Sequence, residues 1–452
     1  MSLPERNGVS GFPRHMDRRE FLRGVAFAGL AAAVPAPAPP KRPADEAGWE
    51  RLREEFLFEP GHIYFNNASL GSPPRAVVDE LAARYRRLSA NPTAAKLEIS
   101  RQIEESVRPA AARLVGADSG EVALVRSASE GLFLIANGIE LKPGDEVVTT
   151  TQEHPGGITP WLERAERSGL VVRQVPITSP PPDKEKILEL LSGVFSNRTR
   201  VLFFCHVTRG GFLYPVRELC ELARGRGIVS AVDGAQAVGT MPVDLRALGC
   251  DLYASSLHKW TLAPAGNGLL YVRRDFQSRF HPPGRPPGKQ AGACDFEPLG
   301  TQAIPVRAAA GTALEFVERI GLGRIEERDR VLSNRLKAGL VEIPRFRLLS
   351  PRPVEATSPS ITLFEIEGVE APRTVEQLHA RFHMHVDEHV RDGLNAVRVS
   401  THFYNRPDEV GRLLDALRTL AQNESEEKDR TPVPSHRRGP GFGDRNCDII
   451  PG

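Results

Sequence analysis

Short apolar runs alternate with polar turn residues through the middle of the chain. Between them, apolar residues at helical spacing predict helices such as those at 157–168, 184–194 and 216–226. Several of the runs are apolar on both faces, as strands are when helices cover both sides of a parallel sheet. The pattern therefore predicts an α/β fold built on a large, mainly parallel sheet. The predicted strands are rich in β-branched or aromatic residues and bounded by Gly, Pro, Asp or Asn: EVALVRS (121–127), DEVVTTT (145–151), LVVRQVPI (170–177), RVLFFCHV (200–207), GIVSAVD (227–233), CDLYASS (250–256) and GLLYVRR (268–274).

The length of 452 residues is enough for two or three domains. We expect the large sheet domain at 76–319. A smaller α+β domain is expected to comprise an N-terminal part at 44–75 and a C-terminal part at 320–422. Residues 423–452 are polar, charged and rich in Pro and Gly, which predicts a disordered tail.

Residues 1–43 have the layout of a bacterial export signal followed by a linker. Arg18 and Arg19 precede VAFAGLAAAV, an apolar run too short to span a membrane stably. The arginine pair resembles a twin-arginine signal, Ala31–Ala33 fits a cleavage site, and Met16 directly before the motif offers a second start. The Pro-rich stretch that follows predicts an extended linker. We therefore expect a periplasmic protein; a disordered N-terminus with chance arginines, and a cytoplasmic protein, is the alternative.

The overall charge points to no highly charged partner. Lys plus Arg number 59 against 57 for Asp plus Glu, and a net charge of +2 gives no reason to expect nucleic acid or an acidic membrane surface. No apolar stretch of 18 or more residues follows the N-terminal region, so no stable membrane span is expected in the mature chain. The cysteines form no CxxC pair and no metal-binding spacing; they are Cys205, Cys220, Cys250, Cys294 and Cys447.

Polar residues follow the predicted strands at their carboxyl ends, where the active residues of an α/β sheet belong. SASE (127–130) has capping-box spacing and predicts a helix N-terminus, whose free N–H groups suit a phosphate. His154, Asp233 and Lys259 each follow another strand. Alone, these are a cap, a loop histidine and a helix-capping aspartate, but lysine is seldom buried without a partner or a task.

Together these groups are the set that pyridoxal phosphate needs. A lysine holds its aldehyde as a Schiff base, and a carboxylate keeps its ring nitrogen protonated so that the ring accepts electrons from a carbanion at the substrate's Cα. A helix N-terminus holds the phosphate. The sequence therefore predicts an enzyme that uses pyridoxal phosphate on an amino acid.

The motif VDGAQAVGTMPVDLRALGCDLYASSLHKW (232–260) carries a resemblance to a known family. It places the lysine of Ser-x-His-Lys 26 residues after the aspartate. On this motif the chain resembles the class V group of the aminotransferase fold, which includes cysteine desulfurases and isopenicillin N epimerase. The likeness extends from IYFNNASLGSPP at residue 63 to the segment ending near residue 417. It implies fold type I, the aspartate aminotransferase-like fold, with the cofactor in the large domain.

The resemblance implies a role for each matching residue. Lys259 is the Schiff-base lysine and carries the Cα proton, Asp233 pairs with the ring nitrogen, and His154 stacks on the ring. Arg398 is expected to bind the substrate carboxylate by a two-pronged hydrogen bond, with Asn67 as a second substrate-binding residue. The other expected cofactor-binding residues are Gln236 and Thr208 near the ring's O3′, and Ala128, Ser129, Ser256, His258 and Thr301 at the phosphate. Thr301 would reach the phosphate of a neighbouring subunit, which implies a homodimer.

Two departures from the family pattern bear on the reaction. Desulfurases need a nucleophilic cysteine in a C-terminal loop, and residues 295–446 contain none, so desulfurase activity is not expected. Many relatives have Asn near O3′ where this chain has Thr208 and Arg209. Arg209 is either a second contact to a substrate acid or a surface arginine.

The reaction itself stays open. Epimerisation, transamination and elimination by a C–S lyase all begin with Lys259 removing the Cα proton, and HVTRGG, GTQAIP and STHFYN look most like the isopenicillin N epimerase-like branch. An epimerase also needs an acid on the opposite face, for which Tyr214 and His206 are candidates. A catalytically silent cofactor-binding protein is the alternative; it predicts loss of Lys259 or Asp233, and both are present.

A metal-binding periplasmic protein is a third hypothesis. It rests only on His383, His385 and His389 in RFHMHVDEHV, of which the first two would share one face of a strand. Because no acidic or cysteine partners stand at a fitting spacing, no metal site is predicted.

Overall fold

The computed structural model describes residues 43, 45–285, 288, 292–297, 300–351, 354–391 and 393–430. The chain divides into two compact units, residues 1–38 and 39–452. All of the described residues belong to the second unit. The predicted export signal with its arginine pair, most of the linker, and the tail beyond residue 430 with Cys447 lie outside the described residues and stay predictions.

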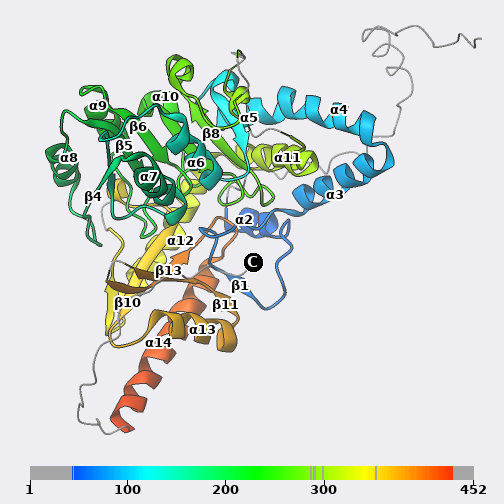
Figure 1. Cartoon of the computed structure of the whole chain (residues 1–452). Helices are drawn as coiled ribbons and strands as arrows, with labels where there is room; N and C mark the ends of the chain where they lie inside the picture. The colour runs from blue at the N-terminus through cyan, green and yellow to red at the C-terminus, as the bar shows by residue number, and fades with distance from the viewer. Residues whose placement is uncertain are drawn as a thin grey trace, which may run out of the picture. The chain divides into compact units, whose positions relative to one another are not determined.

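The large sheet has seven strands in the order β2-β8-β7-β6-β5-β3-β4. β8 runs antiparallel to both of its neighbours, and the other pairings are parallel. Every strand predicted from the sequence is present, which confirms the α/β class (Figure 1). The strands are β2 (Val122–Val125), β3 (Glu146–Thr150), β4 (Val171–Val175), β5 (Thr199–Cys205), β6 (Val229–Asp233), β7 (Leu252–Ser256) and β8 (Gly268–Val272).

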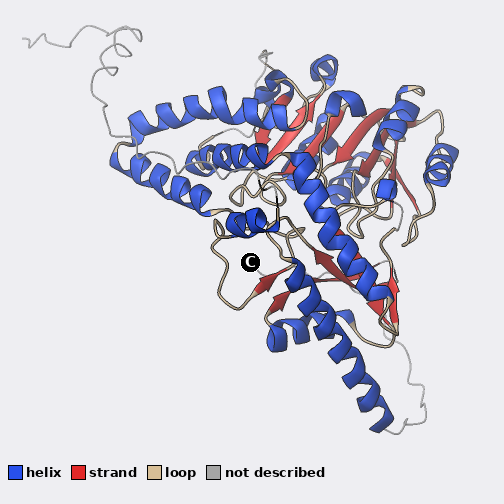
Figure 2. Ribbon diagram, turned by 180° about the vertical axis from the view of Figure 1, so that it is seen from behind, coloured by secondary structure: helices blue, strands red, loops and turns tan. Residues whose placement is uncertain are grey.

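Alternate residues of these strands bury opposite faces of the sheet. On β5, Leu202 and Phe204 pack in the apolar cluster that contains α9 and α11, whereas Val201 and Phe203 pack with α6 and α7. Helices therefore cover both faces (Figure 2), which explains why the central strands are apolar throughout. The helices are α3 (Arg75–Ala90), α4 (Pro92–Gln102), α5 (Arg108–Leu114), α6 (Ala128–Gly138), α7 (Pro155–Ser168), α8 (Lys184–Gly193), α9 (Val216–Arg224), α10 (Leu245–Leu248) and α11 (Ile304–Ile320).

A second, four-stranded antiparallel sheet has the order β12-β13-β10-β9, and β1 pairs with β11 in parallel. A separate apolar cluster joins these strands to three helices and includes Ile63, Leu336, Leu378, Val399 and Leu417. These elements are β1 (Ile63–Tyr64), α12 (Leu322–Val341), β9 (Phe346–Leu348), β10 (Ile361–Ile366), α13 (Ala371–Phe382), β11 (Met384–His385), β12 (Asp387–Arg391), β13 (Leu394–Ser400) and α14 (Pro407–Arg430), and α2 (Glu46–Arg53) precedes them.

Part of the segment predicted to be disordered is helical. Residues 423–430 continue α14 to Arg430, and the residues beyond lie outside the described part of the chain. Residues 423–430 are mostly Glu, Lys and Arg, which favour a helix, and the first proline follows at 432. The predicted boundaries between the large and small domains stay a prediction. Among the described residues, no helix combines the length and the apolar character needed to cross a membrane.

Candidate active site

The carboxyl ends of five strands bring the predicted site residues to one edge of the large sheet. β2, β3, β5, β6 and β7 run in the same direction, so their ends meet at the same edge. The ends of these strands and the segments that follow them carry Ser127–Ser129, His154, Thr208–Arg209, Asp233 and Lys259, in that order. This is the edge at which ligands bind in open α/β sheets.

The segment after β2 forms a helix N-terminus, as predicted. Ser127 caps α6 by accepting a hydrogen bond from the Glu130 N–H at 3.2 Å. The return bond of the expected capping box goes instead from the Arg126 N–H to Glu130, at 2.6 Å. The Ala128 N–H donates to Ser256 Oγ at 2.9 Å, so this predicted phosphate donor already has a partner, while Ser129 is exposed at the same helix start.

Lys259 lies on the loop after β7, and the loop after β1 hydrogen-bonds to the backbone of this loop. The Asn67 amide donates to the Lys259 carbonyl at 3.3 Å, and the Gly71 N–H donates to the His258 carbonyl at 2.9 Å. A Cβ on residue 71 would stand 1.9 Å from the Lys259 oxygen, so only glycine allows this approach. Burial lowers the pKa of Lys259 to about 8, and the positive charges of Arg398 and Arg209 contribute.

His258 has one ring nitrogen committed within the protein. Its Nδ1 lies 3.1 Å from the carbonyl oxygen of Asn267, which only accepts, so Nδ1 carries the proton. Nε2 is then the nitrogen left for another ligand. Burial and the charge of Lys259 lower the pKa of His258.

Asp233 ends β6 as a buried carboxylate. Its Oδ1 accepts a hydrogen bond from the Ala235 N–H at 2.9 Å, and the residue is 4% exposed. Burial raises its pKa, and the charge of Lys259 partly offsets this. Gln236, expected at O3′, has its amide engaged on both sides: its oxygen accepts from the Trp260 indole at 2.8 Å, and its nitrogen donates to the Ala68 carbonyl at 3.0 Å.

His154 caps α7 next to the start of α6. Its Nδ1 accepts from the Gly156 N–H at 3.0 Å. A Cβ on residue 156 would stand 2.5 Å from Ser129 Oγ, so glycine allows the two helix starts to lie together. His154 is partly exposed. Its pKa is nevertheless lowered to about 4, by the burial of the rest of the side chain and by the positive charges of Lys259 and nearby arginines.

Arg398 reaches the site from β13 and is almost fully buried. Its Nη2 donates to Asp387 Oδ2, and lies 3.4 Å from Asn66 Oδ1. Arg209 donates to the same Asp387 oxygen at 3.0 Å. Burial lowers the pKa of Arg398 to about 10, although Asp387 opposes this shift. The structure thus joins the two predicted substrate-binding arginines through one carboxylate.

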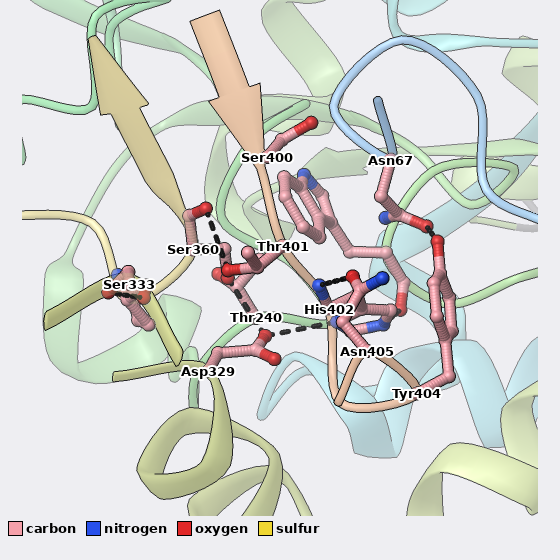
Figure 3. A network of polar contacts seen from close by, with 12 residues as sticks. Asn67, Thr240, Asp329, Ser333, Ser360, Ser400, Thr401, His402, Tyr404 and Asn405 are labelled. Atoms are coloured by element: carbon pink, nitrogen blue, oxygen red, sulfur yellow. Dashed lines mark hydrogen bonds and ion pairs between the residues drawn. The ribbon is translucent and has the colours of Figure 1, made fainter. Parts of the chain in front are cut away.

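A buried polar network supports the Lys259 loop from the second sheet (Figure 3). His402 lies with Nε2 3.1 Å from the Trp260 carbonyl and Nδ1 3.0 Å from Asp329 Oδ2. Tyr404 donates to Asn67 Oδ1 at 2.7 Å. Asn67, predicted to bind substrate, is therefore committed by both ends of its amide to positioning the loop.

Other predicted candidates have structural partners. The Thr208 hydroxyl accepts from the Phe212 N–H at 3.0 Å within a tight turn. His206 Nδ1 lies 2.8 Å from Tyr253 Oη, and the Tyr214 hydroxyl donates to Thr150 Oγ1 at 3.1 Å. Burial lowers the pKa of His206 to about 4 and raises that of Tyr214 well above its ordinary value. Neither exchanges protons readily near neutral pH. Thr301 is exposed.

Sequence reasoning missed three residues of this region: Asn66, Asp387 and Glu153. Glu153 is buried, accepts from Thr150 Oγ1 at 2.7 Å, and has its pKa raised to about 8 by burial and by the charge of Asp233. The one available sequence signal was the charged or polar residue at every second position, Asp387, His389 and Arg391, which predicts a strand with one polar face.

His383 and His385, predicted to share one face of a strand, do not lie on the same strand. His383 ends α13 in the left-handed region with φ 54°, whereas His385 lies on β11. His389 is buried on β12. No group of three or more histidine, cysteine, aspartate or glutamate side chains in the described part of the chain is arranged to hold a metal ion.

Comparisons with known proteins match most of the chain. The family model for Aminotransferase class-V matches residues 63–413. Isopenicillin N epimerase of Amycolatopsis lactamdurans is 33% identical over 406 residues, 83% of this chain and 99% of that protein. A probable cysteine desulfurase of Xylella fastidiosa (strain 9a5c) is 31% identical over 412 residues, 84% of this chain and 96% of that protein.

Solved structures of related enzymes have a similar fold. The apo cysteine desulfurase of Thermococcus onnurineus NA1 has a TM-score of 0.74 at 27% identity and covers 83% of this chain and 98% of its own. A variant of the cystine C-S lyase C-DES, with glycine covalently linked to its PLP cofactor, has a TM-score of 0.74 at 26% identity and covers 81% and 98%.

Proposed function

Since the chain belongs to the class-V aminotransferase family and has the fold type I architecture of pyridoxal-phosphate enzymes, we propose that the carboxyl edge of its large sheet holds this cofactor and acts at the Cα of an amino acid. The observation that carries the proposal is the placement of Lys259, whose pKa is lowered to about 8, and buried Asp233 at the ends of adjacent strands, near enough for each charge to affect the other.

The residues present fit the cofactor. Lys259 supplies the amine that holds its aldehyde, and buried Asp233 supplies a carboxylate for its ring nitrogen. The start of α6, with the exposed Ser129, supports a phosphate. His258 is also expected at the phosphate, but its Nε2 would donate to it only with the ring protonated, because Nδ1 already donates to the Asn267 carbonyl. His154 is expected over the ring, and Gln236 retains one N–H for O3′. When bound, pyridoxal phosphate supplies an electron sink for the pair of electrons left at Cα.

Lys259 is the proton carrier in this proposal. With a pKa near 8, roughly one-tenth of this amine is uncharged at pH 7, far more than for an ordinary lysine, and the uncharged form attacks a carbonyl and accepts a proton. The negative charge of Asp233, which is 4% exposed, opposes the lowering of the Lys259 pKa. Arg398 orients the substrate by its carboxylate, which fixes the Cα–H bond relative to Lys259.

The cysteines argue against a desulfurase. Cys205 is the described cysteine at the carboxyl edge, but burial raises its pKa well above the ordinary value, and a buried thiol is a poor nucleophile. Cys294 lies two residues after Gly292, which packs against Gly120 just before the amino end of β2. Epimerisation and transamination need no enzyme cysteine, and neither does elimination of the kind the C–S lyase name describes, which is the second candidate.

The decisive experiment compares two buried lysines. Lys259→Met should abolish the visible absorption of covalently bound cofactor and all turnover. Lys337→Met is the matched control: Lys337 is also buried, with a pKa lowered to about 8, but lies on α12 away from the strand ends. Turnover by Lys259→Met above the uncatalysed rate would contradict the assignment.

The reaction type is read from products. The enzyme is incubated with a panel of amino acids in D2O, followed by chiral analysis and by detection of keto acids and sulfide. Inversion with deuterium at Cα identifies an epimerase, keto acid with a pyridoxamine form identifies a transaminase, and pyruvate with sulfide or persulfide identifies a C–S lyase.

Export through the twin-arginine route is part of the proposal. A cofactor enzyme exported unfolded would meet little cofactor outside the cytoplasm, whereas a folded enzyme carries it along. It would also complete folding in a reducing compartment, where the cysteines need not pair. The variant with Arg18→Lys and Arg19→Lys should leave active enzyme in the cytoplasm. Finding the unaltered protein wholly cytoplasmic with residues 16–40 attached would count against export.

A homodimer is also proposed, with Thr301 reaching the phosphate site of the other subunit. Light scattering of the holoenzyme should give twice the chain mass. Thr301→Ala should weaken cofactor retention without changing the mass, and a monomeric active enzyme would contradict the proposal.

A further inference from the structure

One face of the second sheet carries a row of charged and polar side chains toward the site. On β12, Asp387 and His389 are two residues apart and share a face. Across the strand pair, Arg398 lies opposite Asp387, and Ala396 lies opposite His389. Glu388 and Val390, which alternate with them, are exposed.

Arg209 joins this row from the loop after β5. Its Nη2 donates to Asp387 Oδ2 at 3.0 Å and to the Glu388 carbonyl at 2.8 Å. Because Arg398 donates to the same Asp387 oxygen, the two donor nitrogens stand no more than about 6 Å apart. Arg209 and Arg398 also lie near enough to lower the pKa of Lys259. Both arginines therefore border the proposed reaction centre.

Several buried polar atoms in the row have no hydrogen-bond partner among the residues that the structure describes. They are Nε of Arg209, Nε of Arg398, and both ring nitrogens of His389, which is 2% exposed. A buried donor without a partner costs free energy in a folded protein, and such groups are found where a ligand completes them. Burial and the charges of the arginines lower the pKa of His389 to about 3, so the ring is neutral and offers one N–H and one acceptor.

Building on the proposed function, we propose that Arg209, Arg398 and His389 form a subsite that selects amino acids carrying a second acidic group. Arg398 holds the α-carboxylate, and Arg209 holds the side-chain acid, with the His389 N–H beside it. Asp387 fixes the spacing of the two guanidiniums. A separation of at most about 6 Å between donors suits the two carboxylates of a short dicarboxylic amino acid.

The alternative role for Arg209 is to tie the loop after β5 to β12. Such a tie needs only the bonds to Asp387 and Glu388, and it would affect every substrate equally. A subsite affects acids and leaves their amides unchanged. The test therefore compares aspartate, glutamate and 2-aminoadipate, each with its side-chain amide, because the two members of a pair differ in charge and hardly in shape.

The experiment uses the holoenzyme of the parent, Arg209→Gln, Arg209→Lys and a control, Arg217→Gln. Arg217 is exposed on α9 and pairs with Glu221. Dissociation constants come from the change in cofactor absorption on adding each amino acid, and kcat/KM is measured where turnover occurs. Thermal melting of each variant reports whether it is folded.

We expect the parent and the control to bind at least one acid 10-fold or more tightly than its amide. Arg209→Gln should lower that preference by about 10- to 100-fold, the range of a charge-assisted hydrogen bond, with little change for amides. The preference of Arg209→Lys for acids should lie between that of the parent and that of Arg209→Gln. Equal binding of acids and amides by the parent, or an equal loss for both in a folded Arg209→Gln, would overturn the subsite and leave the proposed function intact. No spectral change with any amino acid would overturn both.

Discussion

Removing the imidazole of His402 is expected to destabilise the protein strongly. His402 and Asp329 are both 0% exposed. The Trp260 carbonyl only accepts, so His402 Nε2 carries a proton, and one further proton lies between Nδ1 and Asp329 Oδ2. In His402→Leu, the Ser360 hydroxyl, at 2.8 Å, is the one donor left to the Asp329 carboxyl within the described part of the chain, where its Oδ1 has no partner.

Breaking a buried pair by removing one partner costs about 3–5 kcal/mol, so the free energy of unfolding should fall by that amount. Asp329→Asn is the matched control, because an amide nitrogen at the position of Oδ2 donates one N–H to Nδ1 of a neutral His402 and the other to the Ser360 hydroxyl oxygen; it should cost about 1 kcal/mol. Urea unfolding followed by circular dichroism measures both. The loss of unfolding free energy in His402→Leu should be smaller at pH 5 than at pH 8, because protonation of Asp329 removes its unpaired buried charge. Equal unfolding midpoints for His402→Leu and the parent would refute the reasoning, as would an Asp329→Asn as damaging as His402→Leu.

Three further outcomes are expected. The rate at which cofactor-free protein takes up pyridoxal phosphate should rise with pH with a midpoint near 8, the pKa of Lys259, rather than near the 10.5 of an ordinary lysine; a rate that still climbs steeply above pH 9 would argue against it. Asp233→Asn should retain cofactor but lose orders of magnitude in kcat, because a neutral amide does not stabilise a protonated ring nitrogen; activity within a few-fold of the parent would mean that Asp233 does not face the ring. The pKa of Glu153 is raised from 4.5 to about 8, so its folded state binds the extra proton. Relative to Glu153→Gln, the parent should therefore lose stability as the pH rises from 4.5 to 8, by up to about 1.4 kcal/mol per pH unit, and equal stability of the two proteins across this range would contradict the burial argument.

The sheet and its chemistry were predictable because each depends on neighbouring residues. Every strand of the large sheet is a short run that contains β-branched or aromatic residues and has turn residues at its ends, and each candidate at the carboxyl edge ends or closely follows one of these runs. Ser127 and Glu130 also marked the start of α6 through local spacing, although the return bond goes to the Arg126 N–H. Local patterns suffice where the determining contacts lie within one strand–helix unit.

The support of the site was not predictable, because it joins segments far apart in the chain. Asn67 meets Tyr404, and Asn66 meets Arg398, across more than 330 positions. A one-residue difference in the loop after β1 decides which asparagine faces the arginine and which holds the Lys259 carbonyl. Asp387 carries no motif, and only the register of β12 against β13 places it opposite Arg398.

The arginines that would bind substrate also set the basicity of Lys259. Their charges help to lower its pKa to about 8 before substrate arrives, which favours the uncharged amine needed to hold the cofactor. A substrate carboxylate on Arg398, and a second on Arg209, would offset that charge and move the pKa of Lys259 upward. The amine would then be a stronger base at the step in which it takes the Cα proton. Linkage requires the reverse as well: a protonated Lys259 strengthens the binding of the anionic substrate by the same free energy. Charge placed at the second sheet therefore acts on the lysine of the first without any contact between them.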